Sequence, residues 1–200
     1  MAWKSQAMAL MDIARAIEAR DPYSSGHAAR VTAIAEVVAA RLGWDDDQID
    51  VLRIGAALHD IGKLDVPDTV LRKPGPLNEA ELDHVRAHPG DGARMVGLVR
   101  TYRAAVPCIL HHHERWDGHG YPSGSAGTEI PIEARVLAVA DAFDAMTSDR
   151  PYRRALAQGH AVAELERCAG TQFDPDVVAV FAEAWRQGAF ETSAGIRAAS

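Results

Sequence analysis

Apolar residues recur along this chain mainly at three- and four-residue intervals, the spacing that places side chains on one face of an α-helix. Residues 5–20 show this spacing first, with Ala7, Leu10, Ala14 and Ile17 on one stripe. No stretch alternates apolar and polar residues for long enough to predict a β-strand. Further helices are predicted over residues 25–42, 45–60, 78–88, 104–114, 131–147, 158–169 and 175–188. One more helix is predicted to begin at about residue 89. The expected fold is therefore an all-α bundle.

Residues that cap helices mark several of the predicted starts. Ser24 or Ser25 can cap the second helix, and Asp45 with Gln48 three residues on has the capping-box pattern for the third. The same capping role is expected of Asn78 and Asp174. A side-chain cap pairs backbone N–H groups that the first turn of a helix leaves without partners, so these positions predict where the helices begin.

Two connections interrupt the helical pattern. Residues 115–130 form the longest one and carry Gly118, Gly120, Gly124 and Gly127. Loops of this length in compact domains are often functional. The other connection, residues 62–76, is rich in glycine and proline with a short apolar turn in it. Neither indicates a domain boundary, and no repeat or low-complexity tract divides the chain.

The composition fits a folded domain and excludes some function classes. Of the 200 residues, 48% are apolar and 24% charged, which favours a packed core over disorder. The net charge is −7 and the sequence pI is about 5.7. This balance disfavours a partner that is a nucleic acid polymer, because surfaces for such partners concentrate positive charge. An anionic small molecule can still bind where a few cations or metals gather.

The cysteines and the hydropathy bear on the compartment. Cys108 and Cys168 lie in apolar surroundings and form no Cys-x-x-Cys pair, so they predict buried side chains rather than a zinc ribbon or a disulfide framework. No apolar run approaches the roughly 20 residues of a membrane span. The N-terminus shows no basic segment followed by an apolar stretch. We therefore expect a cytoplasmic protein without membrane insertion.

Polar residues occur at one position where the pattern requires apolar ones. His59 and Asp60 end an apolar helix and precede Ile61. A buried carboxylate is costly unless a positive group faces it. A divalent transition metal is the simplest such partner, because it accepts imidazole nitrogen and carboxylate oxygen together. From this pair alone, a capped helix end with a neutral histidine remains the more economical interpretation.

Asp141 shifts that balance toward a metal site. It lies in the most apolar predicted helix of the chain, and Asp144 follows three residues later on the same face. A purely structural explanation requires partners for two buried carboxylates, and the sequence identifies none.

Histidines supply the other ligand type. His112 and His113 are adjacent, and successive helical residues are about 100° apart. They can therefore converge only if the helix frays at its end or if they serve different metals. His27 and His88 are further candidates. The histidines expected to be exposed are His84, His119 and His160. The candidate ligands are His27, His59, Asp60, His88, His112, His113 and Asp141.

Seven ligands exceed the needs of one ion, and Asp60 could bridge two. Two divalent ions about 3.5–4 Å apart polarise a phosphoryl group and generate a hydroxide nucleophile. The ligand set contains no cysteine, which argues against structural zinc. The residues thus favour a binuclear hydrolytic site.

The order of these ligands, His…His-Asp…His…His-His…Asp, resembles the HD superfamily of metal-dependent phosphohydrolases. Within it, the HD-GYP group is marked by His-His-Glu-x-x-Asp-Gly-x-Gly-Tyr-Pro, which residues 112–122 match without departure. Other stretches similar to the family are residues 21–23 with His27 and Arg30-Val31, then residues 58–63, 73–77, 140–141, 148–153 and 172–175. The resemblance covers roughly residues 20–185, and a motif of eleven residues is specific where a lone His-Asp pair is weak.

The resemblance implies an HD-domain helical bundle with a long GYP loop that hydrolyses cyclic di-GMP to pGpG or GMP by a metal-bridging hydroxide. It implies two divalent ions, iron or manganese, held by the seven residues named above. Asp60 and Lys63 are the residues expected to be catalytic. The residues expected to contact the substrate are Lys63, Asp144, Arg150, Arg153 and Tyr121. Contacts between the GYP loop and GGDEF-domain proteins are also implied.

The number of metals depends on one departure from some relatives. Some HD-GYP proteins are similar to this chain but hold a third metal. Their extra ligand is a glutamate four residues before the first histidine in the order of ligands given above. Here the first histidine is His27, and the corresponding residue is Tyr23. A neutral phenol is a poor ligand for a hard divalent ion, so we expect two metals.

Three other interpretations remain open at this stage. The same fold could act on another nucleotide or cyclic dinucleotide, or it could be a catalytically silent binding or scaffold domain for GGDEF proteins. A di-iron oxygenase is the third, because related HD folds do redox chemistry. The complete ligand set and Tyr121 argue against a silent domain. Lys63 and two nearby arginines favour phosphate chemistry over redox chemistry.

The resemblance divides the chain into three parts. Residues 1–20 are expected to form a helix that is the remnant of a linker or stalk, residues 21–190 the HD-GYP domain, and residues 191–200 a flexible tail. The apolar stripe of the first helix could also pair two chains in a homodimer.

Overall fold

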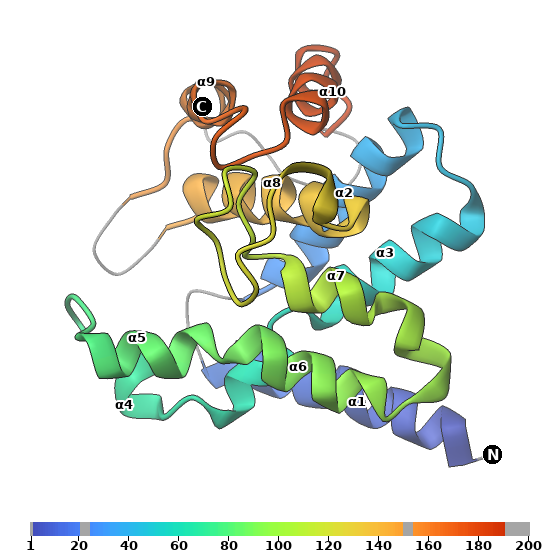
Figure 1. Cartoon of the computed structure of the whole chain (residues 1–200), viewed down its shortest axis with the longest axis vertical. Helices are drawn as coiled ribbons and strands as arrows, with labels where there is room; N and C mark the ends of the chain where they lie inside the picture. The colour runs from blue at the N-terminus through green and yellow to red at the C-terminus, as the bar shows by residue number, and fades with distance from the viewer. Residues whose placement is uncertain (1, 21–24, 150–153, 191–200) are drawn as a thin grey trace.

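The computed structural model describes residues 2–20, 25–149 and 154–190, and within these ranges the chain is helical with no β-strand (Figure 1). The α-helices are α1 (Ala2–Arg20), α2 (His27–Arg41), α3 (Asp46–Leu58), α4 (Asp68–Leu71), α5 (Glu79–Arg86), α6 (His88–Gly97), α7 (Val106–His111), α8 (Ile132–Thr147), α9 (Gln158–Arg167) and α10 (Pro175–Arg186). Shorter 3-10 turns are η1 (Ile61–Asp65), η2 (Arg100–Ala105) and η3 (Gly127–Glu129). The predicted all-α fold is confirmed.

Three of the predicted caps are present. The Asp45 side chain accepts a hydrogen bond from the backbone N–H of Gln48, and the Gln48 side chain accepts one from the backbone N–H of Asp45, which completes the capping box. Asn78 and Glu81 form the same arrangement at the start of α5. Asp174 caps α10 by accepting bonds from two backbone N–H groups of its first turn. These helices therefore begin where the sequence predicts.

The start of α2 differs from the prediction. Ser25 does not cap it, and Ser24 lies outside the described residues. Gly26 occupies the N-cap position with a φ of 70°, and it has no side chain with which to cap the helix. Glycine adopts this left-handed conformation without a steric clash, so the tight turn into α2 takes precedence over a serine cap. Residues 62–76 also hold more structure than predicted, namely η1 and α4.

The helices pack around two apolar clusters. The first joins α2, α3, α8, α9 and α10, and its aromatic rings include Phe143 and Phe181, whose centroids lie 5.0 Å apart. The second joins α1, η1, α6, η2 and the end of α3 at Leu58. α7 contributes Cys108 to the first cluster and Ile109 to the second. In Figure 1, α8, α9 and α10 of the first cluster lie above α1 and α6 of the second, with α7 between them.

The N-terminal helix α1 packs against the rest of the chain through Leu10 and Ile17. The assignment of residues 1–20 to a linker or stalk stays a prediction, and residues 191–200 lie outside the described residues. Cys108 and Cys168 are free and buried, as expected. No helix in the described ranges is long and apolar enough to cross a membrane.

Gly62 allows η1 to approach the start of α6 closely. A Cβ added at residue 62 would lie 2.0 Å from the carbonyl oxygen of His88 and 2.6 Å from the backbone nitrogen of Gly92. Both are backbone atoms that cannot rotate away, so only glycine fits here. This approach brings the chain that follows Asp60 directly beside His88.

Candidate metal centre

The candidate ligands lie on helix ends that converge on one point. His27 is the first residue of α2, His59 follows the last residue of α3, His88 is the first residue of α6, and His112 follows the last residue of α7. Asp141 comes from within α8. Five helices far apart in the sequence thus supply side chains to one site.

The ligand atoms form three overlapping groups, and within each group all atoms lie within 4.8 Å of one another. The groups are His27 with His59 and Asp141, then His59 with Asp60 and His112, then His88 with His112 and His113. The structure therefore brings all seven sequence candidates together. Asp60 lies between the outer groups, with Oδ2 3.6 Å from His59 Nε2 and Oδ1 3.4 Å from His88 Nε2. Its two oxygens are placed to serve two ions.

Backbone carbonyls fix the orientation of three of the histidine rings. The Nδ1 atoms of His59, His88 and His112 lie 2.6–2.7 Å from the carbonyl oxygens three residues earlier. A carbonyl only accepts hydrogen bonds, so each Nδ1 carries the proton. Each Nε2 then keeps a free lone pair, and these are the atoms that face the cluster. A hydrogen bond on the far ring nitrogen is the usual support of a metal-binding histidine.

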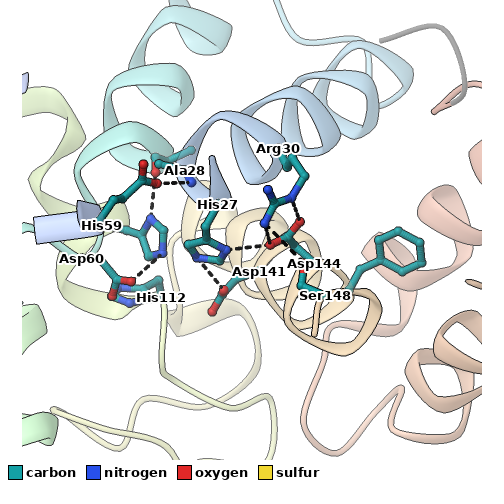
Figure 2. A network of polar contacts seen from close by, with 12 residues as sticks. His27, Ala28, Arg30, His59, Asp60, His112, Asp141, Asp144 and Ser148 are labelled. Atoms are coloured by element: carbon teal, nitrogen blue, oxygen red, sulfur yellow. Dashed lines mark hydrogen bonds and ion pairs between the residues drawn. The ribbon is translucent and has the colours of Figure 1, made fainter. Parts of the chain in front are cut away.

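His27 is oriented by a carboxylate instead (Figure 2). Its Nδ1 lies 2.7 Å from Asp144 Oδ2, and its Nε2 lies 3.3 Å from Asp141 Oδ1. Arg30 donates to both oxygens of Asp144. Asp144 is 2% exposed, so it supports His27 from behind. The predicted contact of Asp144 with substrate stays a prediction.

His112 and His113 converge although they are adjacent. α7 ends at His111, so the helical separation of about 100° between successive residues no longer applies. Their ring centroids lie 4.1 Å apart, and both rings contact His88. The two histidines thus converge at the end of a helix, which is one of the two conditions expected from the sequence for their convergence.

Burial keeps the inner histidines neutral. It lowers the pKa of His113 to about 4 and holds the pKa of His112 well below its usual range, with the neighbouring histidines adding to the effect on His112. The pKa of His88 is lowered for the same reason. His27 is the exception: burial alone would lower its pKa, but contacts with Asp141 and Asp144 raise it to about 10, so a metal ion at His27 would have to displace its proton.

The two inner carboxyl groups stay ionised. Burial by itself would raise the pKa of Asp60, but Lys63, His59 and His88 hold it well below its usual range. Contacts with His27 likewise outweigh burial and lower the pKa of Asp141. Neutral imidazoles beside ionised carboxylates form a donor set that suits a divalent transition metal.

One buried atom within the cluster has no hydrogen-bond partner. His59 Nε2 is enclosed by protein and unpaired, and a buried polar atom without a partner costs on the order of 1–3 kcal/mol. It lies in two of the three ligand groups. A metal ion at this position would satisfy it, so the residues present fit a bound metal.

The cluster is closed on one side and open on the other. His59, His88 and His112 are buried, whereas the side chains of Asp60 and Lys63 remain 23% and 28% exposed. Lys63 Nζ lies 2.6 Å from Asp60 Oδ2. The cationic Lys63 therefore borders the open side, where an anionic group would arrive.

The loop over residues 115–130 is folded back onto the centre. The backbone N–H of Tyr121 donates to the carbonyl of His113 at 3.2 Å, and the two rings lie 4.9 Å apart. Glu114 is buried and accepts a bond from the N–H of Ser123. Burial and the nearby Asp60 and Asp141 raise the pKa of Tyr121, so its hydroxyl stays protonated and can donate.

Gly120 is required for this loop path. A Cβ at residue 120 would lie 2.4–2.6 Å from the backbone of Glu114 and Arg115. We therefore expect Gly120→Ala to push the loop outward, displace Tyr121 from His113 and lower substrate turnover by about tenfold or more, by analogy with other misplaced groups. Limited proteolysis and kinetics would measure both effects. Ser123→Ala, which alters an exposed side chain of the same loop, is the control. Unchanged loop protection in Gly120→Ala would contradict the expectation.

Sequence reasoning gave no role to Arg30 or Glu114. Arg30 follows His27 by three residues, and Glu114 lies inside the motif. Each was visible in a stretch similar to the family, but their partners Asp144 and Ser123 were not predictable from spacing. His84, His119 and His160 are exposed, as predicted. The predicted substrate residues Arg150 and Arg153, and Tyr23 of the metal-number argument, lie outside the described residues.

Comparison with known proteins also indicates an HD domain. A family profile described as HD domain matches residues 13–177. The chain is 42% identical over 171 residues to the cyclic di-GMP phosphodiesterase response regulator RpfG of Xanthomonas campestris, which covers 84% of this chain and 45% of that protein. It is 38% identical over 168 residues to a 3'3'-cGAMP-specific phosphodiesterase 3 of Vibrio cholerae, covering 84% of this chain and 36% of that protein. The chain thus spans less than half the length of either relative.

A solved structure shares the fold. The crystal structure of the cyclic GMP-AMP specific phosphodiesterase V-cGAP3 of Vibrio cholerae superposes with a TM-score of 0.69 and 18% identity, covering 96% of this chain and 51% of that one. At this identity the likeness supports the arrangement of helices alone. The arrangement of the ligands rests on the distances given above.

Proposed function

This chain belongs to the HD domain family, within its HD-GYP type, and on that premise we propose that it is a metal-dependent phosphodiesterase that hydrolyses cyclic di-GMP. The observation that carries the proposal is the nested set of seven nitrogen and oxygen ligands with Asp60 at its centre. The relative RpfG, named a cyclic di-GMP phosphodiesterase, supplies the substrate.

We propose two divalent ions, iron or manganese. His27, His59 and Asp141 would hold one, and His88, His112 and His113 the other, with Asp60 shared. Such ions polarise a phosphoryl oxygen and make water nucleophilic at neutral pH. The soft ligand cysteine does not occur in the set, which favours iron or manganese over structural zinc.

The chain's own groups bind and orient the substrate. Asp60 fixes the spacing of the two ligand groups, and Lys63 at the open side would pair with a phosphate oxygen. The protonated hydroxyl of Tyr121 can donate a hydrogen bond into the same region. Asp144 would orient His27, and its contact with substrate stays part of the proposal. No side-chain nucleophile is needed for this hydrolysis.

Arg150 and Arg153 are proposed to bind the phosphates or a guanine edge. We expect Arg150→Ala and Arg153→Ala to raise KM while metal content stays unchanged, because a lost charge-assisted hydrogen bond costs about 1.5–3 kcal/mol. Steady-state kinetics with elemental analysis would measure both. Arg154→Ala is the matched control, since Arg154 is the exposed neighbour. Unchanged kinetics in both variants would assign the two arginines to the solvated surface.

A second cyclic dinucleotide is a specific alternative substrate. The 38% identical Vibrio cholerae relative is named for 3'3'-cGAMP, which differs from cyclic di-GMP in one base. Faster turnover of cyclic di-GMP than of 3'3'-cGAMP supports the first proposal. Faster turnover of 3'3'-cGAMP supports the alternative.

The deciding experiment uses the purified chain loaded with Mn²⁺, or with Fe²⁺ under anaerobic conditions. Cyclic di-GMP, 3'3'-cGAMP and pGpG are supplied separately, and the products are separated by chromatography. We expect pGpG or GMP from cyclic di-GMP and two metals per chain by elemental analysis. Metal binding without turnover of either dinucleotide would favour the silent binding domain.

Partners and compartment follow as further proposals. The exposed edge of the 115–130 loop, including His119, would contact GGDEF-domain proteins. The exposed Met8 on α1 would lie in a homodimer interface. Two free buried cysteines suit a reducing compartment, so we propose that the protein acts in the cytoplasm.

A further inference from the structure

The N-terminus of α2 is capped from another helix. Gly26 at its N-cap has no side chain to pair the N–H groups of the first turn. The backbone N–H of Ala28 instead donates to Glu18 Oε1 of α1 at 2.7 Å, one of the bonds drawn in Figure 2.

The capped turn begins with a candidate metal ligand. His27 is the first residue of α2, and its ring spans Asp144 and Asp141. A shift of the first turn would therefore move His27 Nε2 relative to His59 and Asp141. The bond from Glu18 fixes the residue next to His27 and so limits that shift.

Glu18 is itself held in place by the end of α1. Arg20 pairs with Asp68 and donates to the carbonyl oxygens of Leu64 and Val66. In return, Arg72 Nε donates to the carbonyl of Arg20 at 2.8 Å. These bonds fasten the last turn of α1 to the segment that follows Lys63.

The same turn borders the centre directly. Glu18 lines a cavity together with Ile17, His27, His59, Asp60 and Lys63. Glu18 therefore stands between a helix fixed to the η1 segment and the ligand that opens α2. Within the described part of the chain, Glu18 is the side chain that accepts the hydrogen bond from the N–H of Ala28.

We propose that Glu18 is a positioning residue of the metal centre, which caps α2 and thereby sets the affinity of the His27 site for its metal. The inference rests on the proposed function only in that the seven residues bind metal. Removing a residue that bonds directly to a metal ligand typically changes metal affinity by about 10–100-fold, and Glu18 bonds the residue next to the ligand, so the lower end of that range is expected. The effect should fall on the ion held by His27, His59 and Asp141.

The test titrates the metal-free chain with Mn²⁺ by calorimetry and compares variants. We expect Glu18→Ala to weaken one of the two Mn²⁺ sites by about tenfold and leave the other within a factor of about two. Glu18→Gln retains an acceptor oxygen at the same length and should stay within about threefold of wild type. Asp12→Ala, which removes an exposed carboxylate of the same helix, is the control and should bind Mn²⁺ as wild type does.

Three results would overturn the inference. The first is wild-type Mn²⁺ binding in Glu18→Ala, which would make Glu18 only a stabiliser of α2. The second is a Glu18→Gln protein as weak as Glu18→Ala, because the carboxylate would then act by its charge. The third is a wild-type chain that binds no Mn²⁺.

If Glu18→Ala does not fold, Glu18→Asp, whose shorter side chain draws back from Ala28, must weaken the same site. Turnover of cyclic di-GMP is measured separately. A chain that binds Mn²⁺ but does not hydrolyse cyclic di-GMP would contradict the proposed function, and the Mn²⁺ titration would still test the role of Glu18.

Discussion

Asp60→Ala is expected to lose both metal binding and phosphodiesterase turnover. Asp60 is the residue whose two oxygens lie within 3.4–3.6 Å of histidine nitrogens from both outer ligand groups. Its removal would take one negative ligand from both proposed ions and would remove the carboxylate that lies 2.6 Å from Lys63 Nζ. A metal centre contributes several kcal/mol to transition-state stabilisation. The loss of turnover should therefore exceed about a thousandfold, at about 1.4 kcal/mol for each factor of ten.

The measurement combines elemental analysis, turnover of cyclic di-GMP and circular dichroism of the same preparation. Asp65→Ala is the matched control, because Asp65 is an exposed aspartate of η1, five residues away in sequence. It should keep wild-type metal content and activity. A folded Asp60→Ala protein that retains full turnover would exclude the metal-dependent hydrolase.

Local signals predicted the helices well because their causes are local. The capping boxes at Asp45 and Asn78 and the cap at Asp174 use partners within three residues, so the sequence contains both halves of each interaction. The start of α2 was mispredicted because its cap comes from Glu18, ten residues earlier and on another helix. A cap supplied across a turn leaves no spacing signal within the helix that it serves.

The sequence predicted which residues gather at the candidate metal centre, but it did not predict the contacts of every residue around them. Histidines and aspartates in apolar segments, in the order of the HD family, indicated all seven residues that the structure brings together. The role of Asp144 could not be predicted, since its partners His27 and Arg30 precede it by 117 and 114 residues. Sequence spacing placed Asp144 on the face of Asp141, but only tertiary packing decides whether that face meets substrate or another side chain.

Glycine positions show the same limit. The motif included Gly118 and Gly120 without distinguishing why each is needed. In the structure Gly118 has a φ of 79°, whereas Gly120 is needed because backbone atoms occupy the space of its Cβ. Gly62, which follows His59 and Asp60, belongs to the second kind. Close approach between distant segments is a tertiary property that residue type alone does not locate.

Gly62→Ala is expected to damage both the fold and the metal centre. The added Cβ would lie 2.0 Å from the carbonyl oxygen of His88, so η1 and α6 must separate. Overpacking of a fitted interior costs about 1–3 kcal/mol and occasionally more. Because Asp60 precedes η1 and His88 opens α6, the separation should draw Asp60 Oδ1 away from His88 Nε2. We therefore expect a lower denaturant midpoint and loss of metal from the site that contains His88.

Gly90→Ala in α6, the helix that η1 approaches, provides the comparison. A Cβ at Gly90 would meet nothing within 4 Å, so the substitution adds a methyl group without a clash. Alanine is favoured over glycine inside a helix by up to about 1 kcal/mol, and the midpoint of Gly90→Ala should stay equal or rise slightly with metal content unchanged. Equilibrium unfolding and elemental analysis on the two variants separate the clash at residue 62 from a general effect of alanine. If Gly62→Ala unfolds and binds metal as Gly90→Ala does, the close approach of η1 to α6 is not what holds Asp60 beside His88.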